Sequence, residues 1–176
     1  RQSYDRRHAH ITEEEQLRMR PKEDMRRMRQ GFFADCLFGE SPPPEDIEEL
    51  NRRYYFAFKP GVFQVFIVKI DSLEGRFDGE ECQVLTRKVL DILAKYQKLF
   101  FDSAFCVRDS RVYGVLNYPP EDEKLADKAF RAVMENLNMQ KSAFAGMAFT
   151  LCVGSKGTSP AGLRRSMEQA LDAMGQ

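Results

Sequence analysis

The feature that most constrains the fold is an apolar run over residues 62–70, bounded by Pro60-Gly61 before it and Asp71 after it. Apart from Gln64 and Lys69, every residue of the run is Val, Ile or Phe. β-Branched and aromatic residues in a run of this length, between turn-forming residues, are typical of a buried strand. We therefore expect a central strand here.

Three helical patterns follow this strand. Residues 82–98 and 125–137 each carry apolar side chains at spacings of three, four and seven, which is the pattern of one buried helical face. Thr158, Ser159 and Pro160 have the capping and first-turn chemistry for a last helix, whose apolar stripe runs over 163–174.

Strand patterns alternate with these helices. Residues 101–108 and 112–118 are separated by the turn-forming triplet 109–111, so we expect a hairpin, and 147–153 predicts a fourth strand. The order strand, helix, strand, strand, helix, strand, helix is the split βαβ plan. The predicted fold class is therefore α+β, with a ferredoxin-like, mostly antiparallel sheet and two crossover helices on one face.

The chain before the first strand is expected to be helical. Residues 1–20 are too poor in apolar side chains to fold alone and predict a polar linker or tail, while 21–58 predict a helical lead-in to the domain at 59–176. Within the lead-in, Met25, Met28 and Phe32 form a stripe at spacings of three and four, and a second, short helix is expected over 45–53. An apolar stripe of this kind needs a partner.

The composition excludes several classes of protein. The charges of the 27 basic and 27 acidic residues cancel. The chain therefore lacks the net positive charge that would attract it to nucleic acid or to an anionic membrane. The arginines near the start are interleaved with glutamates, which favours a solvated helical face over direct nucleic-acid binding. No apolar run approaches the roughly 18 residues of a membrane span, so we expect a cytoplasmic protein. The chain opens on Arg1 rather than Met, which indicates a piece of something longer.

The sequence predicts no metal centre and no cofactor. His8 and His10 both lie in the polar tail, so the folded part has no histidine to act as a base or as a metal ligand. The four cysteines are too scattered to form a C-x-x-C pair. Two of them, Cys106 and Cys152, lie in strand patterns, where cysteine behaves as a small buried hydrophobe.

Charged residues at the predicted strand ends are the candidate site. Asp71 follows the first strand, where a carboxylate either forms a turn or binds a polar ligand. Arg108, Asp109 and Arg111 surround the predicted hairpin turn. They are either a solvated tip or a site for an anion or for an acidic group of a partner.

Several stretches together carry a resemblance to a known family. They are the strand end Val68–Asp71, the hairpin Val107–Tyr113, the strand end Thr150–Ser155 with the helix Leu163–Leu171, and the lead-in Gly31–Gly39. The chain resembles the degenerate GGDEF-like middle region of AraC-type two-component response regulators. The resemblance implies a nucleotidyl-cyclase type of fold, in which the last helix packs back onto the sheet.

The resemblance also implies that cyclase activity is absent. An active diguanylate cyclase has a Gly-Gly-Asp/Glu-Glu-Phe hairpin, but here Asp109 and Ser110 replace the glycines, and Arg111 and Val112 replace the two acidic residues. Lys69 stands where a second metal-binding carboxylate would be. A cation in the place of a metal ligand opposes phosphoryl transfer, which relies on metal ions that bridge phosphate oxygens. We therefore expect no enzyme activity and no catalytic residues.

The resemblance implies a regulatory domain that lies between a receiver domain and a helix-turn-helix DNA-binding domain in a bacterial transcription regulator. The helix with Met25, Met28 and Phe32 would then transmit signals or form a homodimer. Two alternatives stay open. One is a nucleotide-binding or atypical cyclase-fold domain that uses Lys69 together with Asp71, Arg108 and Arg111, and the other is the related domain of sugar-diacid- or purine-responsive regulators.

Overall fold

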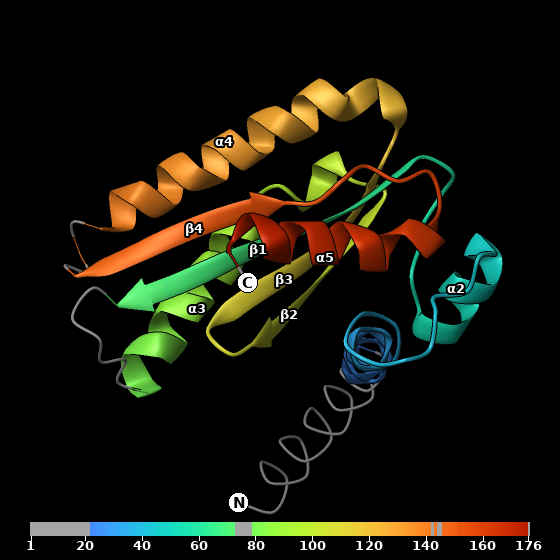
Figure 1. Cartoon of the computed structure of the whole chain (residues 1–176), viewed down its shortest axis with the longest axis horizontal. Coiled ribbons are helices and arrows are strands. Elements are labelled where there is room, and N and C mark those ends of the chain that lie inside the picture. Colours follow the sequence, from blue (N-terminus) through green and yellow to red (C-terminus); the bar gives the residue numbers. More distant parts are fainter. Residues whose placement is uncertain (1–21, 73–78, 142, 144–145, 176) are drawn as a thin grey trace, which may run out of the picture.

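The computed structural model of the chain describes residues 22–72, 79–141, 143 and 146–175. Four strands, all antiparallel to their neighbours, form one sheet in the order β2-β3-β1-β4 (Figure 1). They are β1 (Val62–Ser72), β2 (Asp102–Arg108), β3 (Arg111–Tyr118) and β4 (Met147–Val153). The predicted α+β, ferredoxin-like fold class is confirmed, and the apolar run at 62–70 is one of the two central strands.

The two crossover helices share one face of the sheet. α3 (Gly79–Ala94) and α4 (Glu123–Gln140) bury their apolar stripes in one core with that face. α3 ends at Ala94, four residues before the predicted end. The backbone N–H groups of Lys95 and Tyr96 donate to carbonyls three residues back, which tightens the chain into a 3₁₀ turn at Gln97–Leu99.

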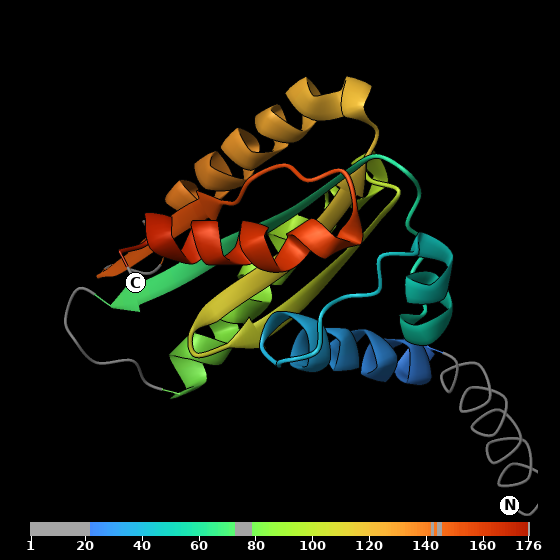
Figure 2. The same cartoon turned by 45° about the vertical axis from the view of Figure 1, so that its right-hand side comes forward.

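The opposite face of the sheet is covered by three other helical segments. They are α5 (Leu163–Ala173), α2 (Ile47–Tyr54) and the helix over residues 22–37, whose last turn, Phe33–Leu37, is a π-helix. We call this last segment the lead-in helix. Figure 1 views it end-on, and Figure 2 shows it side-on below the hairpin edge of the sheet. Phenylalanines of the lead-in helix and of the chain after α2 form one core with β1 and α5.

α5 returns to the sheet as the resemblance implies, through a close contact with the end of β4. Ser166 on α5 is fully buried, and its hydroxyl accepts from the N–H of Val65 (2.9 Å) and donates to the carbonyl of Ser155 (2.8 Å). A Cβ on Gly154 would lie 1.9 Å from the carbonyl oxygen of Ser166, so only glycine fits there. Ser159 occupies the N-cap position and Pro160 the first turn before α5, as predicted, but the Ser159 side chain makes no capping hydrogen bond.

The hairpin between β2 and β3 is tighter than predicted. Its loop is Asp109-Ser110 alone, and both residues have positive φ (52° and 61°), as in the two-residue turns that match the twist of antiparallel strands. Arg111, which the sequence pattern placed in the turn, is the first residue of β3 and pairs with Arg108. The hairpin therefore holds the two arginines directly opposite each other.

The two strand cysteines differ in burial. Cys152 is buried, as predicted, but Cys106 is only partly buried because β2 is an edge strand. Burial raises the pKa of both thiols. In the described part of the chain, no helix has both the length and the apolar character needed to cross a membrane.

Candidate functional site

Three cations lie in one row across the sheet. Arg108 on β2 is opposite Arg111 on β3, and Arg111 is opposite Lys69 on β1. Directly opposite residues point to the same face of a sheet, so the three side chains are neighbours. We call Arg108, Arg111 and Lys69 the cation row. It lies at the hairpin end of the face that carries the lead-in helix and α5, because the next row on that face includes Tyr113 and Ile67 of that core.

Two carboxylates lie beside the cation row. Asp71 Oδ1 is 3.6 Å from Lys69 Nζ, and Asp109 Oδ2 is 3.8 Å from Arg108 Nε. These are long, solvent-exposed contacts, and such pairs contribute about 1 kcal/mol at most. The predicted site residues therefore meet at one end of the sheet, where three cations outnumber two carboxylates.

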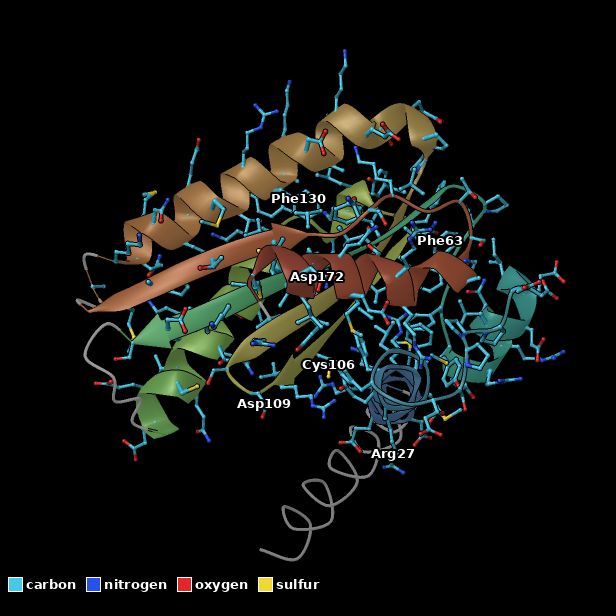
Figure 3. All side chains as sticks on the ribbon, in the orientation of Figure 1. Arg27, Phe63, Cys106, Asp109, Phe130 and Asp172 are labelled. Atoms are coloured by element: carbon cyan, nitrogen blue, oxygen red, sulfur yellow. The ribbon has the colours of Figure 1, made fainter. Side chains whose placement is uncertain are left out.

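Aromatic rings hold the arginines of the row. The Arg108 guanidinium lies over the ring of Phe38, 4.5 Å from its centroid, and Phe38 packs edge-to-face on Tyr113 at 4.8 Å. Arg111 Nη1 donates to the Tyr113 hydroxyl at 3.5 Å. In Figure 3, Asp109 lies at the hairpin tip and Cys106 lies on the side of the hairpin towards the lead-in helix. The cation row is thus tied to the end of the lead-in helix through Phe38.

Comparison with protein families gives one match. The family described as GGDEF-like domain matches residues 38–175, which is most of the chain. The chain belongs to this family. Comparisons with curated proteins and with solved structures gave no significant match. The matched residues contain α2 as well as the sheet, so the GGDEF-like domain includes part of the segment that the sequence analysis assigned to the lead-in.

The cation row of this GGDEF-like domain contains two of the substitutions noted in the sequence. By the resemblance noted in the sequence, Lys69 and Arg111 stand where acidic residues are expected in an active cyclase, and the structure makes them direct cross-strand partners. In the part of the chain that the structure describes, no three His, Cys, Asp or Glu side chains cluster closely enough to hold a metal ion. The chemistry that this arrangement offers is binding of an anion.

The structure separates the three residues of the predicted dimer stripe. Phe32 is fully buried in the GGDEF-like domain, where its ring packs edge-to-face on Tyr54 (5.4 Å) and Phe56 (5.3 Å). The Phe32 side chain therefore supplies part of the apolar cover of the sheet and is not exposed to a partner helix. Met25 and Met28 remain 36% and 38% exposed.

An arginine that the sequence analysis treated as solvated anchors the lead-in helix. Arg29 Nη2 donates to Asp102 Oδ2 at 2.9 Å and to the carbonyl of Tyr55 at 3.0 Å, and its guanidinium lies over the ring of Phe56. Asp102 also accepts from the N–H of Ala57 at 2.7 Å. No local pattern singles out Arg29, because its carboxylate partner is 73 residues away.

A second arginine fixes the C-terminal end of the lead-in helix. Arg164 on α5 donates to the carbonyls of Cys36 (3.2 Å), Gly39 and Ser41. A helix end leaves its last carbonyls without helical partners, and a cation there also complements the helix dipole. Arg29 near the middle of the lead-in helix and Arg164 at its C-terminal end together hold the helix on the sheet.

A buried polar cluster lies beneath this helix. The Cys36 thiol is 3.7 Å from the Tyr54 hydroxyl, which donates to Asp35 Oδ2 at 3.2 Å. Burial, reinforced by the neighbouring Cys36, raises the pKa of Tyr54 to about 12, and burial also raises the pKa of the Cys36 thiol. Both groups are therefore neutral at physiological pH, and the cluster serves packing.

Proposed function

We propose that this GGDEF-like domain is a non-catalytic, signal-transmitting domain of an AraC-type, two-component transcriptional response regulator in the bacterial cytoplasm. In this proposal a receiver domain and a helix-turn-helix domain elsewhere in the protein supply phosphoacceptance and DNA binding, and the segment itself contacts neither nucleic acid nor membrane. The observation that carries the non-catalytic part is the direct pairing of Lys69 with Arg111.

The pairing opposes nucleotide cyclisation for an electrostatic reason. Cyclases need divalent ions that neutralise charge between phosphate oxygens, and carboxylates hold those ions. Two cations on adjacent strands repel a divalent ion instead of holding it. Asp71 lies nearby, but its closest charged contact is Lys69.

A turnover assay tests the non-catalytic part. The purified chain is incubated with GTP or ATP and Mg²⁺ or Mn²⁺, and products are separated by chromatography. We expect no product above the protein-free control. Turnover that disappears in Asp71→Asn, in a preparation that is folded by circular dichroism, would overturn this part of the proposal.

The anchoring of the lead-in helix supports the transmitting role. Because Arg29 binds near the middle of the lead-in helix and Arg164 binds at its C-terminal end, we expect the helix and the sheet to move as one body. A displacement of the helix by a preceding domain would therefore displace the sheet and whatever follows α5. In the full-length regulator, Arg164→Ala should uncouple the signal from a transcriptional reporter while DNA binding in vitro persists.

We also propose a homodimer through the lead-in helix, with Met25 and Met28 rather than Phe32 at the contact. Their partial exposure on one helix supports this. Sedimentation of the chain across the micromolar range should give a dimer, and a Met25→Glu, Met28→Glu double variant should give a monomer. A wild-type chain that stays monomeric throughout would contradict the proposal.

A second candidate function is nucleotide binding without catalysis. The excess of cations in the cation row favours it, because phosphate groups pair with arginine and lysine. Calorimetry with guanine and adenine nucleotides, with and without Mg²⁺, separates the two proposals. Saturable nucleotide binding without Mg²⁺ would support the second candidate, because the cation row pairs with phosphate directly. The regulatory proposal predicts no nucleotide binding in either condition.

A further inference from the structure

A cleft of about 440 Å³ separates the lead-in helix from the end of β2. Its lining includes Gln30, Phe33 and Phe38 from the lead-in helix and the residue after it, and Cys106, Val107 and Arg108 from β2. We call it the helix–strand cleft. Its volume is within the roughly 300–1,000 Å³ of small-molecule sites.

The cleft exists because the lead-in helix covers only part of the free edge of β2. Arg29 donates to the carbonyl of Ser103 at 3.3 Å, and Gln30 donates to the carbonyl of Phe105 at 3.0 Å. These contacts close the first part of the edge. Two residues further on, Val107 is 46% exposed, and no side chain of the lead-in helix contacts its backbone in the described hydrogen bonds.

Backbone alternation gives the open part of the edge a hydrogen-bond donor. In an antiparallel pair, every second residue of an edge strand directs its N–H and C=O away from the sheet. The carbonyls of Ser103 and Phe105 point away from the sheet, towards the lead-in helix. Because Val107 is two residues further along β2, its N–H and C=O also point away from the sheet. The N–H of Val107 therefore lies on the free edge, where Val107 lines the cleft.

Arg108 gives the same end of the cleft a positive charge. Its guanidinium is held over the Phe38 ring at 4.5 Å, which fixes the direction of its planar donors. Among the described ion pairs its carboxylate partner is Asp109, at 3.8 Å, and that side chain is 87% exposed. A pair this exposed leaves most of the charge available to a ligand.

We propose that the helix–strand cleft binds a small organic anion, a carboxylate or phosphate monoester carried on a flat apolar body. The body lies against the partly exposed Phe38 ring, and the anionic group pairs with Arg108 and with the N–H of Val107. A planar guanidinium beside a backbone donor suits the oxygens of either anion. This inference does not depend on the regulatory proposal and requires no metal ion.

Binding at this place ties the lead-in helix to β2, because the two walls of the cleft come from different elements. A ligand that contacts both walls stabilises the docked helix by RT ln(1 + L/Kd), which grows with the free ligand concentration L. The ligand would therefore act on the same helix that Arg29 and Arg164 hold.

A fluorescence titration tests the proposal with a probe of the right chemistry, 8-anilinonaphthalene-1-sulfonate, which joins aromatic rings to an anionic group. We expect saturable binding to the wild-type chain without metal. Phenyl phosphate and benzoate should displace the probe, whereas the neutral benzyl alcohol should not at equal concentration. The stronger of the two competitors identifies the preferred anion.

The decisive variant is Arg108→Gln, with Arg87→Gln as its control, because Arg87 is an exposed arginine on α3 with one long contact to Asp91. We expect at least a tenfold weaker affinity for the probe in Arg108→Gln and none of this loss in Arg87→Gln. Equal affinity in the two variants, displacement by benzyl alcohol, or no saturable binding to the wild type would overturn the proposal.

Cysteine protection provides a readout that does not depend on a variant. Cys106 lines the cleft, whereas Cys82 on α3 is a similarly half-buried thiol that contacts Ser110 outside it. Alkylation by iodoacetamide is followed by peptide mass spectrometry, with and without phenyl phosphate and benzoate. We expect the anions to slow labelling of Cys106 severalfold and to leave Cys82 unchanged. Equal slowing of both thiols, or of neither, would contradict the assigned place.

Discussion

Lys69 on β1 and Arg111 on β3 are direct partners in the antiparallel ladder, so two cations face each other across the centre of the sheet. Arg108 extends the same row onto β2. The turn sets the pairing of Arg108 with Arg111, since Asp109 and Ser110 alone connect β2 to β3.

The first prediction concerns the cost of this pairing. Like charges directly opposite each other destabilise a sheet, and a cross-strand pair changes stability by about 0.2–1 kcal/mol. Arg111→Glu replaces repulsion of Lys69 by attraction, so we expect the free energy of unfolding in urea to rise by about that amount. The gain should shrink at high salt. A loss of stability in low salt would show that the two cations do not repel each other.

A second prediction concerns the anchor of the lead-in helix. The Arg29–Asp102 pair is largely buried, and removing one partner leaves the other charge without compensation. Arg29→Ala should lower the free energy of unfolding by about 2–3 kcal/mol. Arg53→Ala, which breaks an exposed pair with Glu49, is the control and should cost less than about 1 kcal/mol. Similar losses in both variants would contradict the anchoring role.

The third prediction tests the contact between α5 and the end of β4. Gly154→Ala places a Cβ against the backbone of Ser166, which cannot yield as a flexible side chain does. We expect a loss of about 1–3 kcal/mol in the free energy of unfolding. At Gly79, by contrast, an added Cβ meets nothing within 4 Å, so Gly79→Ala should leave stability unchanged or slightly raised.

The fourth prediction concerns alkaline pH. Burial raises the pKa of Tyr54 from 10.0 to about 12, so folding favours the neutral phenol. This contribution is complete below the unfolded pKa of 10.0 and is lost as pH rises towards about 12, because the unfolded state then releases its proton first. The free energy of unfolding should therefore fall across this window.

Tyr54→Phe separates this effect from general alkaline denaturation. The variant should be less stable than the wild type at neutral pH, because it loses the hydrogen bond to Asp35, but its stability should fall less steeply above pH 10.0. Burial also raises the pKa of Tyr118. Tyr118 therefore contributes the same pH dependence of stability to the wild type and to the variant. Parallel slopes in the two proteins would exclude Tyr54 as the titrating group.

The sequence predicted most of the fold because its elements have clear periodicity. The run at 62–70 and the alternation at 147–153 became β1 and β4. The stripes of α3, α4 and α5 are mostly buried as their spacing indicates, but Leu125, at the start of the predicted α4 stripe, is 47% exposed. These patterns follow from the local geometry of helices and strands, so they can be recognised in a single sequence. The predicted end of α3 and the predicted length of the hairpin turn were both wrong. For the turn, a one-residue difference leaves no periodic signal in the sequence.

The candidate site was predicted only as separate residues. Asp71, Arg108 and Arg111 were each noted for their charge, but the row that they form with Lys69 depends on strand register. A shift of one residue would turn a strand's side chains to the other face. Arg29 was missed entirely, since its role rests on Asp102, far away in the sequence.

The measurement that tests the central claim most directly is calorimetric titration of the purified chain with GTP, with and without Mg²⁺. Because Lys69 and Arg111 oppose a divalent ion, we expect no heat that depends on Mg²⁺ and no cyclic product afterwards. Metal-dependent binding that Asp71→Asn abolishes and Arg87→Gln preserves would contradict the claim and favour a nucleotide-binding, cyclase-type domain.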